Sequence, residues 1–277
     1  MGPVEKAVWY IESHFAEPVT LEGLAEEAGV SRFHLARAFA AATGQSAMRY
    51  LRGRRLSEAA KALAAGAPDI LAAALEAGYG SHEAFTRAFR DQFGTTPESV
   101  RAQRCFDTLQ LVEPIKMDES LIVDLARPVI AKGKPLLVAG LGERYTSDSS
   151  KAVPALWQKF QPYLGHVPGQ VGGVAYGVIH NVDDDNNFDY IAGVEVADFS
   201  GLTGEFARVR IPAQTYAVFT HHDHISSIRR VVHTIWSKSL AEGAYIPADA
   251  PNFERYGPEF DGRTGLGGFQ IWVPIKG

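Results

Sequence analysis

Hydrophobic residues follow the helical period through the first third of the chain and then change to short continuous runs. In residues 1–105, which are rich in Ala, Leu, Arg and Glu, apolar positions recur at three and four and predict amphipathic helices. After about residue 120, short runs of Val, Ile, Tyr, Phe and Gly stand between turn residues, as β-strands do. We therefore expect an α+β chain of two domains: an all-α domain at 1–106, a connecting segment at 107–120 and a strand-rich domain at 121–277.

One helical unit occurs twice in the first domain. TLEGLAEEAGVSRFHLARAF is echoed by DILAAALEAGYGSHEAFTRAF when the two runs are aligned on Gly29 and Gly78. In each copy a short helix ends at a glycine that can adopt positive φ, and Ser31 or Ser81 then offers an N-cap to a second helix. Such pairs predict two helix-turn-helix units, whose second helix enters the DNA major groove. Two ordinary helical hairpins in an all-α core are the alternative.

The second copy carries further matches, in ALEAGYGSHEAFTRAFRDQFGTTPESVR at 74–101. Over residues 4–104 the chain resembles the AraC/XylS family of bacterial regulators. The resemblance implies two helix-turn-helix subdomains joined by a long helix within Ala47–Ala65. It implies recognition helices in successive major grooves of promoter DNA, and RNA polymerase as a further partner.

Outward positions of the two second helices are the candidates for contact with DNA. Arg37 and Arg87 occupy equivalent positions, and a guanidinium can bridge O6 and N7 of guanine. Glu83 is open to a second interpretation, as a partner of the helix dipole in the first turn. Nearby arginines such as Arg52 and Arg54 fit phosphate contacts or salt bridges better than base readout. The DNA-binding candidates are Arg32, Phe33, Arg37, Ser81, His82, Glu83, Thr86 and Arg87.

The charge distribution is compatible with this expectation. The chain has a net charge of −5, but residues 1–105 are balanced and the excess of acid lies in the remainder. Between residues 31 and 61 the only acidic residue is Glu58, and the excess of basic residues favours a local basic surface that could bind phosphate. The basic residues of this stretch are Arg32, Arg37, Arg49, Arg52, Arg54, Arg55 and Lys61.

The second domain also contains a repeat. PLLVAGLGERYT, VPALWQKFQPYL, GGVAYGVIH and YIAGVEV match QTYAVFTHH, IRRVVHTIWSKSL, NFERYGPEF and GFQIWVPI in order. A strand-helix-strand-strand unit used twice predicts a curved antiparallel sheet backed by two helices. A groove between the two halves is the expected binding site, because ligand sites are concave, mostly apolar and carry few polar groups.

The runs GLGERYT, VPALW, AGVEV, IPAQTYAVFTH, PNFERYGPEFD and IWVPI resemble the GyrI-like effector-binding domains. This resemblance implies a small organic effector, often cationic and aromatic, held by a carboxylate among aromatic rings. Gln270 stands where relatives commonly carry an acid, so Glu195, its equivalent in the first repeat, becomes the first choice for the carboxylate. A salt bridge for Glu195 and core packing for the aromatic residues are the alternatives. The effector-binding candidates are Tyr176, Glu195, Trp236, Phe253, Glu254, Tyr256 and Trp272.

Other classes of function receive less support. Cys105 is the single cysteine, which fits the cytoplasm, and no apolar run is long enough to span a membrane. We expect no cofactor and no metal: adjacent residues in His221–His224 point to opposite sides, and the acids at 183–185 fit a hairpin turn. We expect no enzyme, although a small-molecule hydrolase using Glu254 and Tyr256, or a protein-sequestering module, remains an alternative for the second domain.

Overall fold

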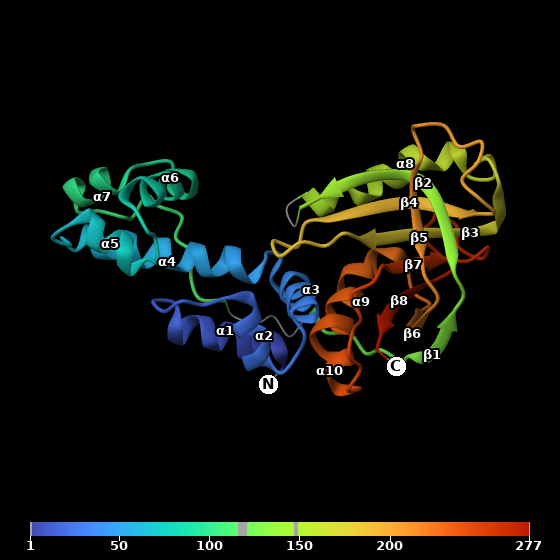
Figure 1. The fold of residues 1–277 in the computed structure, drawn as a ribbon, viewed down its shortest axis with the longest axis horizontal. Coiled ribbons are helices and arrows are strands. Elements are labelled where there is room, and N and C mark those ends of the chain that lie inside the picture. Colours follow the sequence, from blue (N-terminus) through green and yellow to red (C-terminus); the bar gives the residue numbers. More distant parts are fainter. Residues whose placement is uncertain (1, 116–120, 147–148, 277) are drawn as a thin grey trace.

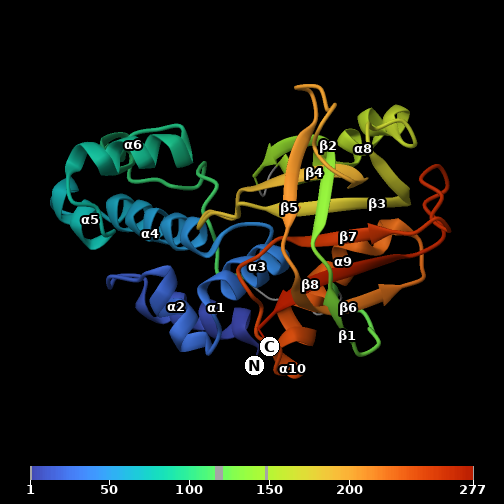
Figure 2. The ribbon, with the colours of Figure 1, turned by 45° about the vertical axis from the view of Figure 1, so that its right-hand side comes forward.

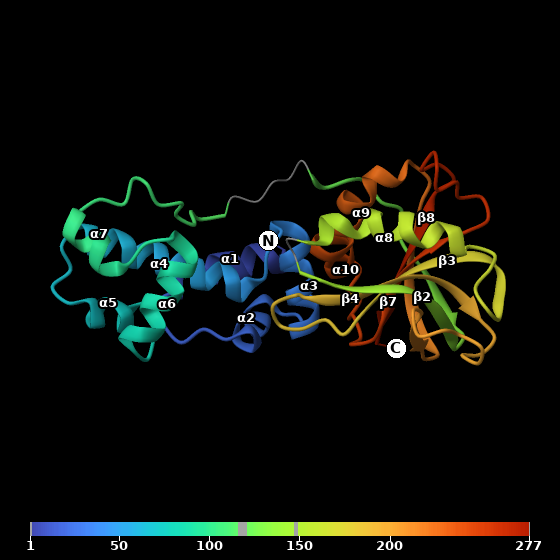
Figure 3. The ribbon, with the colours of Figure 1, turned by 90° about the horizontal axis from the view of Figure 1, so that it is seen from above.

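The computed structural model describes residues 2–115, 121–146 and 149–276. It is an α+β molecule in which helices form one end and a strand-rich domain forms the other (Figure 1). The first helical unit lies between the second unit and the sheet, as the view from above also shows (Figure 3). The expected order of an all-α part followed by an antiparallel sheet with helices is confirmed.

The first helix-turn-helix unit follows the predicted local signals. Gly29 adopts the left-handed conformation with φ of 72°, and the Ser31 hydroxyl accepts a hydrogen bond from the His34 amide at 3.2 Å. The turn and the cap therefore stop one helix and start the next within three residues. The helices are α1 (Pro3–His14), α2 (Leu21–Ala28) and α3 (Arg32–Thr43).

The second unit repeats this construction and is joined to the first by a long helix. Gly78 has φ of 78°, and the Ser81 hydroxyl accepts from the Ala84 amide at 3.2 Å. Phe85 and Phe89 are fully buried and form the centre of a small core of its own. The helices are α4 (Ala47–Ala64), which is the connector, α5 (Ile70–Glu76), α6 (His82–Phe93) and α7 (Pro97–Gln103).

A buried ion pair fixes α4 to α1. The Arg54 side chain is only 5% exposed and donates to both Glu12 oxygens, to Glu58 and to the Val112 carbonyl. The Val112 amide in turn donates to the Ser57 hydroxyl at 2.8 Å. The segment after α7 therefore packs on α4 over its described residues, while residues 116–120 of the predicted connector lie outside the described chain.

The strand-rich domain consists of two strand-helix-strand-strand repeats, as predicted. Short helical turns extend both helices: η2 (Ser149–Ala152) and η3 (Gln161–Tyr163) flank the first, and η4 (Ile225–Ser227) precedes the second. The first repeat comprises β2 (Leu136–Tyr145), α8 (Val153–Phe160), β3 (Gln170–His180) and β4 (Phe188–Val196). The second comprises β6 (Gln214–His221), α9 (Ile228–Thr234) continuing into a π-helical turn η5 (Ile235–Ser239) and α10 (Leu240–Glu242), β7 (Asn252–Tyr256) and β8 (Phe269–Ile275).

The antiparallel sheet is nearly symmetric about its centre. Its strand order is β1-β6-β8-β7-β3-β4-β2-β5, so equivalent strands of the two repeats lie at equal distances from the β7–β3 pair. The sequence analysis did not identify the two edge strands, β1 (Val129–Gly133) and β5 (Ala207–Ile211). Each precedes one repeat in the chain and pairs with the other repeat, which ties the halves together.

The sheet has two different faces because strand side chains alternate. The face that packs on α8 and α9, here called the helix face, carries Tyr190, Ala217 and Tyr256. Figure 3 shows both helices on the same side of the strands. The opposite face carries Tyr176, Tyr216 and further aromatic residues in a separate core. Figure 2 shows the strands of the sheet after a turn of 45°.

Candidate DNA-binding surface and effector site

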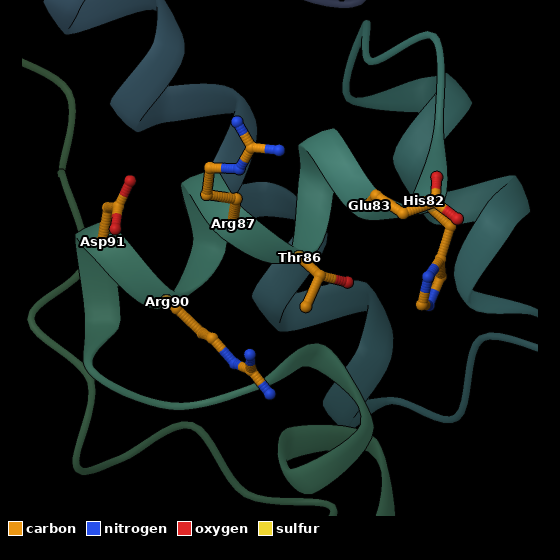
Figure 4. Close-up of a pocket in the computed structure, with 6 residues that line it drawn as sticks. All are labelled: His82, Glu83, Thr86, Arg87, Arg90 and Asp91. Atoms are coloured by element: carbon orange, nitrogen blue, oxygen red, sulfur yellow. The ribbon is translucent and has the colours of Figure 1, made fainter.

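The second recognition helix, α6, exposes the face that the sequence predicts. His82, Glu83, Thr86, Arg87, Arg90 and Asp91 line a shallow hollow along it, with the two arginines projecting from neighbouring turns (Figure 4). Arg87 is exposed and, within the described residues, has no hydrogen bond or ion pair. Its guanidinium is therefore available for an external acceptor.

Two other candidates on α6 have partners within the chain. His82 contacts Glu98 of α7, with 3.0 Å between Nε2 and Oε1. The pKa of Glu83 lies below its ordinary value because the carboxylate accepts from its own backbone amide and from Ser81 at the helix start. These contacts favour the capping interpretation of Glu83, and the proposed base contact of this residue stays a prediction.

The first recognition helix, α3, differs from the sequence expectation. Arg37, predicted to point outward, is only 7% exposed, and its guanidinium carbon lies 5.3 Å from the ring centre of Trp236 and 5.7 Å from that of Phe188. Phe33 also contacts the Trp236 ring, edge to face, with centroids 5.9 Å apart. The orientation prediction was wrong for Arg37 because the side of α3 that the sequence predicts to face DNA packs against the second domain.

Polar contacts support this docking of α3. His34 Nε2 lies 3.1 Å from the Trp236 carbonyl, and burial lowers the pKa of His34, so the ring donates from Nε2 in its neutral form. Arg32 pairs with Glu22 at 3.1 Å and with Asp184, in the turn between β3 and β4, at 3.2 Å. The acids at 183–185, predicted as a hairpin turn, thus place one carboxylate beside the recognition helix.

A carboxylate lies among aromatic side chains on the helix face, near the centre of the sheet. Glu254 Oε2 accepts from Tyr190 at 2.6 Å and from Tyr256 at 2.9 Å, and Trp157 donates to the Tyr190 oxygen at 2.9 Å. Gly177 faces Glu254 across the β3–β7 pair, where any side chain would overlap the carboxylate and the Tyr190 hydroxyl. The site is thus a carboxylate surrounded by aromatic residues, with two hydroxyl donors on one of its oxygens.

Charges in this site are coupled to α3. Burial raises the pKa of Glu254 above its ordinary value, and the two tyrosine hydroxyls and the positive charge of Arg37 offset only part of this rise. Burial lowers the pKa of Arg37 to about 10 against the attraction of Glu254, so the guanidinium is charged at neutral pH. The pKa values of Tyr190 and Tyr256 are raised well above the ordinary value by burial and by Glu254, so both hydroxyls stay protonated donors.

The predicted effector residues fall into two groups on opposite faces of the sheet. Glu254, Tyr256 and Trp236 lie on the helix face. Phe253 stacks on Trp272 on the opposite face, at a centroid distance of 5.3 Å. Neighbours in a strand point to opposite sides, so a single groove containing both Phe253 and Glu254 was a wrong expectation.

The opposite face also contains Tyr176 and Glu195. Tyr176 contacts the Phe253 ring, and Glu195 acts on Tyr176 electrostatically. Gln270 accepts from Arg255 at 3.4 Å and from the Trp272 indole at 3.1 Å. The sheet therefore separates Glu195 from the Glu254 site. Gln270 also lies on the face opposite Glu254, beside Arg255 and Trp272.

Three residues of the site were missed by the sequence analysis: Trp157, Phe188 and Tyr190. Period-two alternation along β4 gives a signal for Tyr190, because it shares a face with Ala192 and Val194.

Within the described part of the chain, no group of three or more His, Cys, Asp or Glu residues could hold a metal ion. His221, one of the histidines considered as a metal ligand, contacts the Ser227 hydroxyl at 2.9 Å.

Family models match both parts of the chain. The model of the GyrI-like small molecule binding domain matches residues 128–276, more than half of the chain. The chain belongs to the GyrI-like family. A helix-turn-helix domain model matches residues 24–103, ahead of the GyrI-like domain. Among the helices described, none is long and apolar enough to cross a membrane.

Curated relatives match either the whole chain or a part of it. Transcriptional regulator Rob of Salmonella typhimurium is 27% identical over 275 residues, covering 95% of this chain and 93% of Rob. Transcriptional regulator BrlR of Pseudomonas aeruginosa is 29% identical over 197 residues, covering 65% of this chain and 72% of BrlR. Regulatory protein SoxS of Escherichia coli is 34% identical over 98 residues, covering 35% of this chain and 92% of SoxS. This chain is a transcription regulator similar to Rob, with a helix-turn-helix DNA-binding region and a GyrI-like small-molecule-binding domain.

Proposed function

We propose that this regulator responds to a cationic aromatic compound, which it binds at Glu254 on the helix face of the GyrI-like domain. The observation that carries the proposal is a carboxylate held by two tyrosine hydroxyls, beside rings that already surround a guanidinium. Ring faces attract a cation, and a desolvated pair of this kind is worth about 2 kcal/mol or more. A neutral ligand of the same shape would gain no such attraction.

On the DNA side, we propose that α6 reads bases through Arg87 and that α3 does so through Arg37 once its face is free. Arg32, Phe33, Ser81, His82, Glu83 and Thr86 would contact bases or backbone around these two arginines. The exposed arginine on α6 supports the first assignment, and its equivalence to Arg37 in the repeat supports the second. We further propose that the regulator acts in the bacterial cytoplasm and contacts RNA polymerase at the promoter.

We infer that the GyrI-like domain binds its ligand without turning it over. Tyr190 and Tyr256 both direct their protons to the same Glu254 oxygen, at 2.6 and 2.9 Å. Both hydrogen bonds stabilise the ionised carboxylate and so make it a weaker general base. Unchanged ligand recovered after prolonged incubation supports this inference, and product formation abolished by Glu254→Gln would instead support the hydrolase alternative.

Calorimetric titration with tetraphenylphosphonium tests the effector proposal. Wild-type protein should bind this cation and should not bind triphenylphosphine oxide, a neutral molecule with similar rings. Glu254→Gln should weaken binding of the cation at least tenfold, whereas Glu195→Gln, on the opposite face, should leave it unchanged. Equal loss in both variants, or equal binding of the neutral analogue, would contradict the assignment of the charge to Glu254.

A further inference from the structure

The Glu254 site already holds a cation that belongs to the chain itself. The Arg37 guanidinium lies over the rings of Trp236 and Phe188, and no described residue accepts a hydrogen bond from its Nε. Glu254 acts on the guanidinium electrostatically and raises the pKa of Arg37 against the effect of burial. A flat, charged group that lies over aromatic rings and is attracted by a carboxylate has the chemistry that the effector proposal assigns to the ligand.

We propose that Arg37 is an internal ligand of the effector site, and that a cationic aromatic compound bound at Glu254 expels it and uncovers the first recognition helix. This inference rests on the proposed function of the Glu254 site. It adds a mechanism by which the same arginine side chain serves two surfaces: it neutralises Glu254 in the free protein and contacts DNA in the effector-bound protein.

The two equivalent arginines provide an internal comparison. Arg37 and Arg87 occupy the same position in the two repeats, yet Arg37 is buried and Arg87 is exposed. Three further contacts hold α3 on the GyrI-like domain: Arg32 with Asp184, His34 with the Trp236 carbonyl, and Phe33 with the Trp236 ring. The side of α3 that the proposal assigns to DNA is thus covered by the GyrI-like domain, and the Asp184 carboxylate occupies Arg32.

The internal contact is suited to being reversible. The buried Nε of Arg37 has no acceptor among the described residues, and a buried donor without a hydrogen bond is costly. Guanine in the major groove offers Arg37 two acceptors, so the side chain gains hydrogen bonds when it leaves the site. An aromatic cation without N–H groups, such as tetraphenylphosphonium, has no such donors to satisfy and is the better occupant of the same surroundings.

Competition at Glu254 couples the effector to DNA. Any ligand that requires Arg37 to leave binds only the open fraction of the molecules, so its apparent dissociation constant rises in inverse proportion to that fraction. Effector and DNA both favour the open state, and each therefore increases the affinity of the other by the same factor. Removing the Arg37 side chain should abolish the competition.

Titration of three full-length proteins with tetraphenylphosphonium tests the proposal. Arg37→Ala should bind the cation at least tenfold more tightly than wild type, and Arg87→Ala, the equivalent change on the exposed helix, should match wild type. Equal affinity in wild type and Arg37→Ala overturns the internal-ligand proposal while leaving the effector site intact. Absence of binding in all three proteins overturns the effector proposal itself, and this inference with it.

A second measurement uses wild-type protein alone and does not depend on the folding of a variant. Hydrogen–deuterium exchange should become faster in residues 32–43 when tetraphenylphosphonium is added, because α3 loses its packing partner. Residues 82–93 serve as the reference and should keep their exchange rates. Unchanged or slower exchange in residues 32–43 at a saturating concentration of the cation would show that α3 stays docked, and would refute the release.

Discussion

The space left by Gly177 gives the sharpest test of the Glu254 site. An alanine Cβ at this position would overlap both the Tyr190 hydroxyl and the Glu254 carboxylate. Overpacking of this kind costs about 1–3 kcal/mol, and loss of a hydrogen bond to a charged group costs about 1.5–3 kcal/mol. The lower chain entropy of alanine in the unfolded state returns about 0.4–1 kcal/mol. Gly177→Ala should therefore reduce the free energy of unfolding by about 2–4 kcal/mol.

The same strand supplies a matched control. A Cβ at Gly173 would have nothing within 4 Å, so Gly173→Ala should be neutral or stabilising by up to about 1 kcal/mol. Urea unfolding followed by tryptophan fluorescence measures both variants, and tetraphenylphosphonium affinity should fall at least tenfold in Gly177→Ala only. If the two variants share one unfolding midpoint and one affinity, the packing argument for the carboxylate and Tyr190 is refuted.

Three further predictions address the other parts of the molecule. Arg87→Ala should weaken binding to a duplex selected from a random pool by about 1–3 kcal/mol and relax the preference at one base, measured by fluorescence anisotropy; an unaltered base preference would exclude Arg87 as a reader. Affinity for tetraphenylphosphonium should fall as the pH drops through the raised pKa of Glu254, with the decline beginning above the ordinary value of 4.5, and calorimetry of Glu254→Gln should show no such decline. Arg54→Ala should lower the free energy of unfolding by about 3 kcal/mol, because Glu12 loses its buried partner. The control Arg52→Ala, at an exposed position, should change it by no more than about 0.5 kcal/mol. Similar urea midpoints for the two variants would contradict a structural role for the Arg54–Glu12 pair.

Local signals predicted the helical part well. The turn glycines Gly29 and Gly78 and the caps Ser31 and Ser81 act within a few residues of the chain, so their effect can be read from the sequence. The repeat in the second domain likewise fixed which runs become strands. The edge strands were not identified, because Val129–Gly133 and Ala207–Ile211 are short and gain their partners only from the other repeat.

The site was only partly predictable. Glu254 and Tyr256 were identified together, and period-two alternation would have separated Phe253 from them. The burial of Arg37 has no local signal, because it depends on how α3 docks against Trp236, about 200 positions further along the chain. Sequence repeats make Arg37 and Arg87 look equivalent, and only the tertiary contacts make them different.

The rigidity of α4 has a mechanical consequence. The first helical unit shares one hydrophobic core with the GyrI-like domain. The second unit has its own core, which it forms with the far end of α4. Eighteen residues at a rise of about 1.5 Å make this helix about 27 Å long. A tilt of about 10° at its base displaces its tip by about 5 Å, more than the spacing of about 3.4 Å between stacked bases. A small repacking around Trp236 would thus shift the second helix-turn-helix unit, at the far end of α4, by more than one base pair.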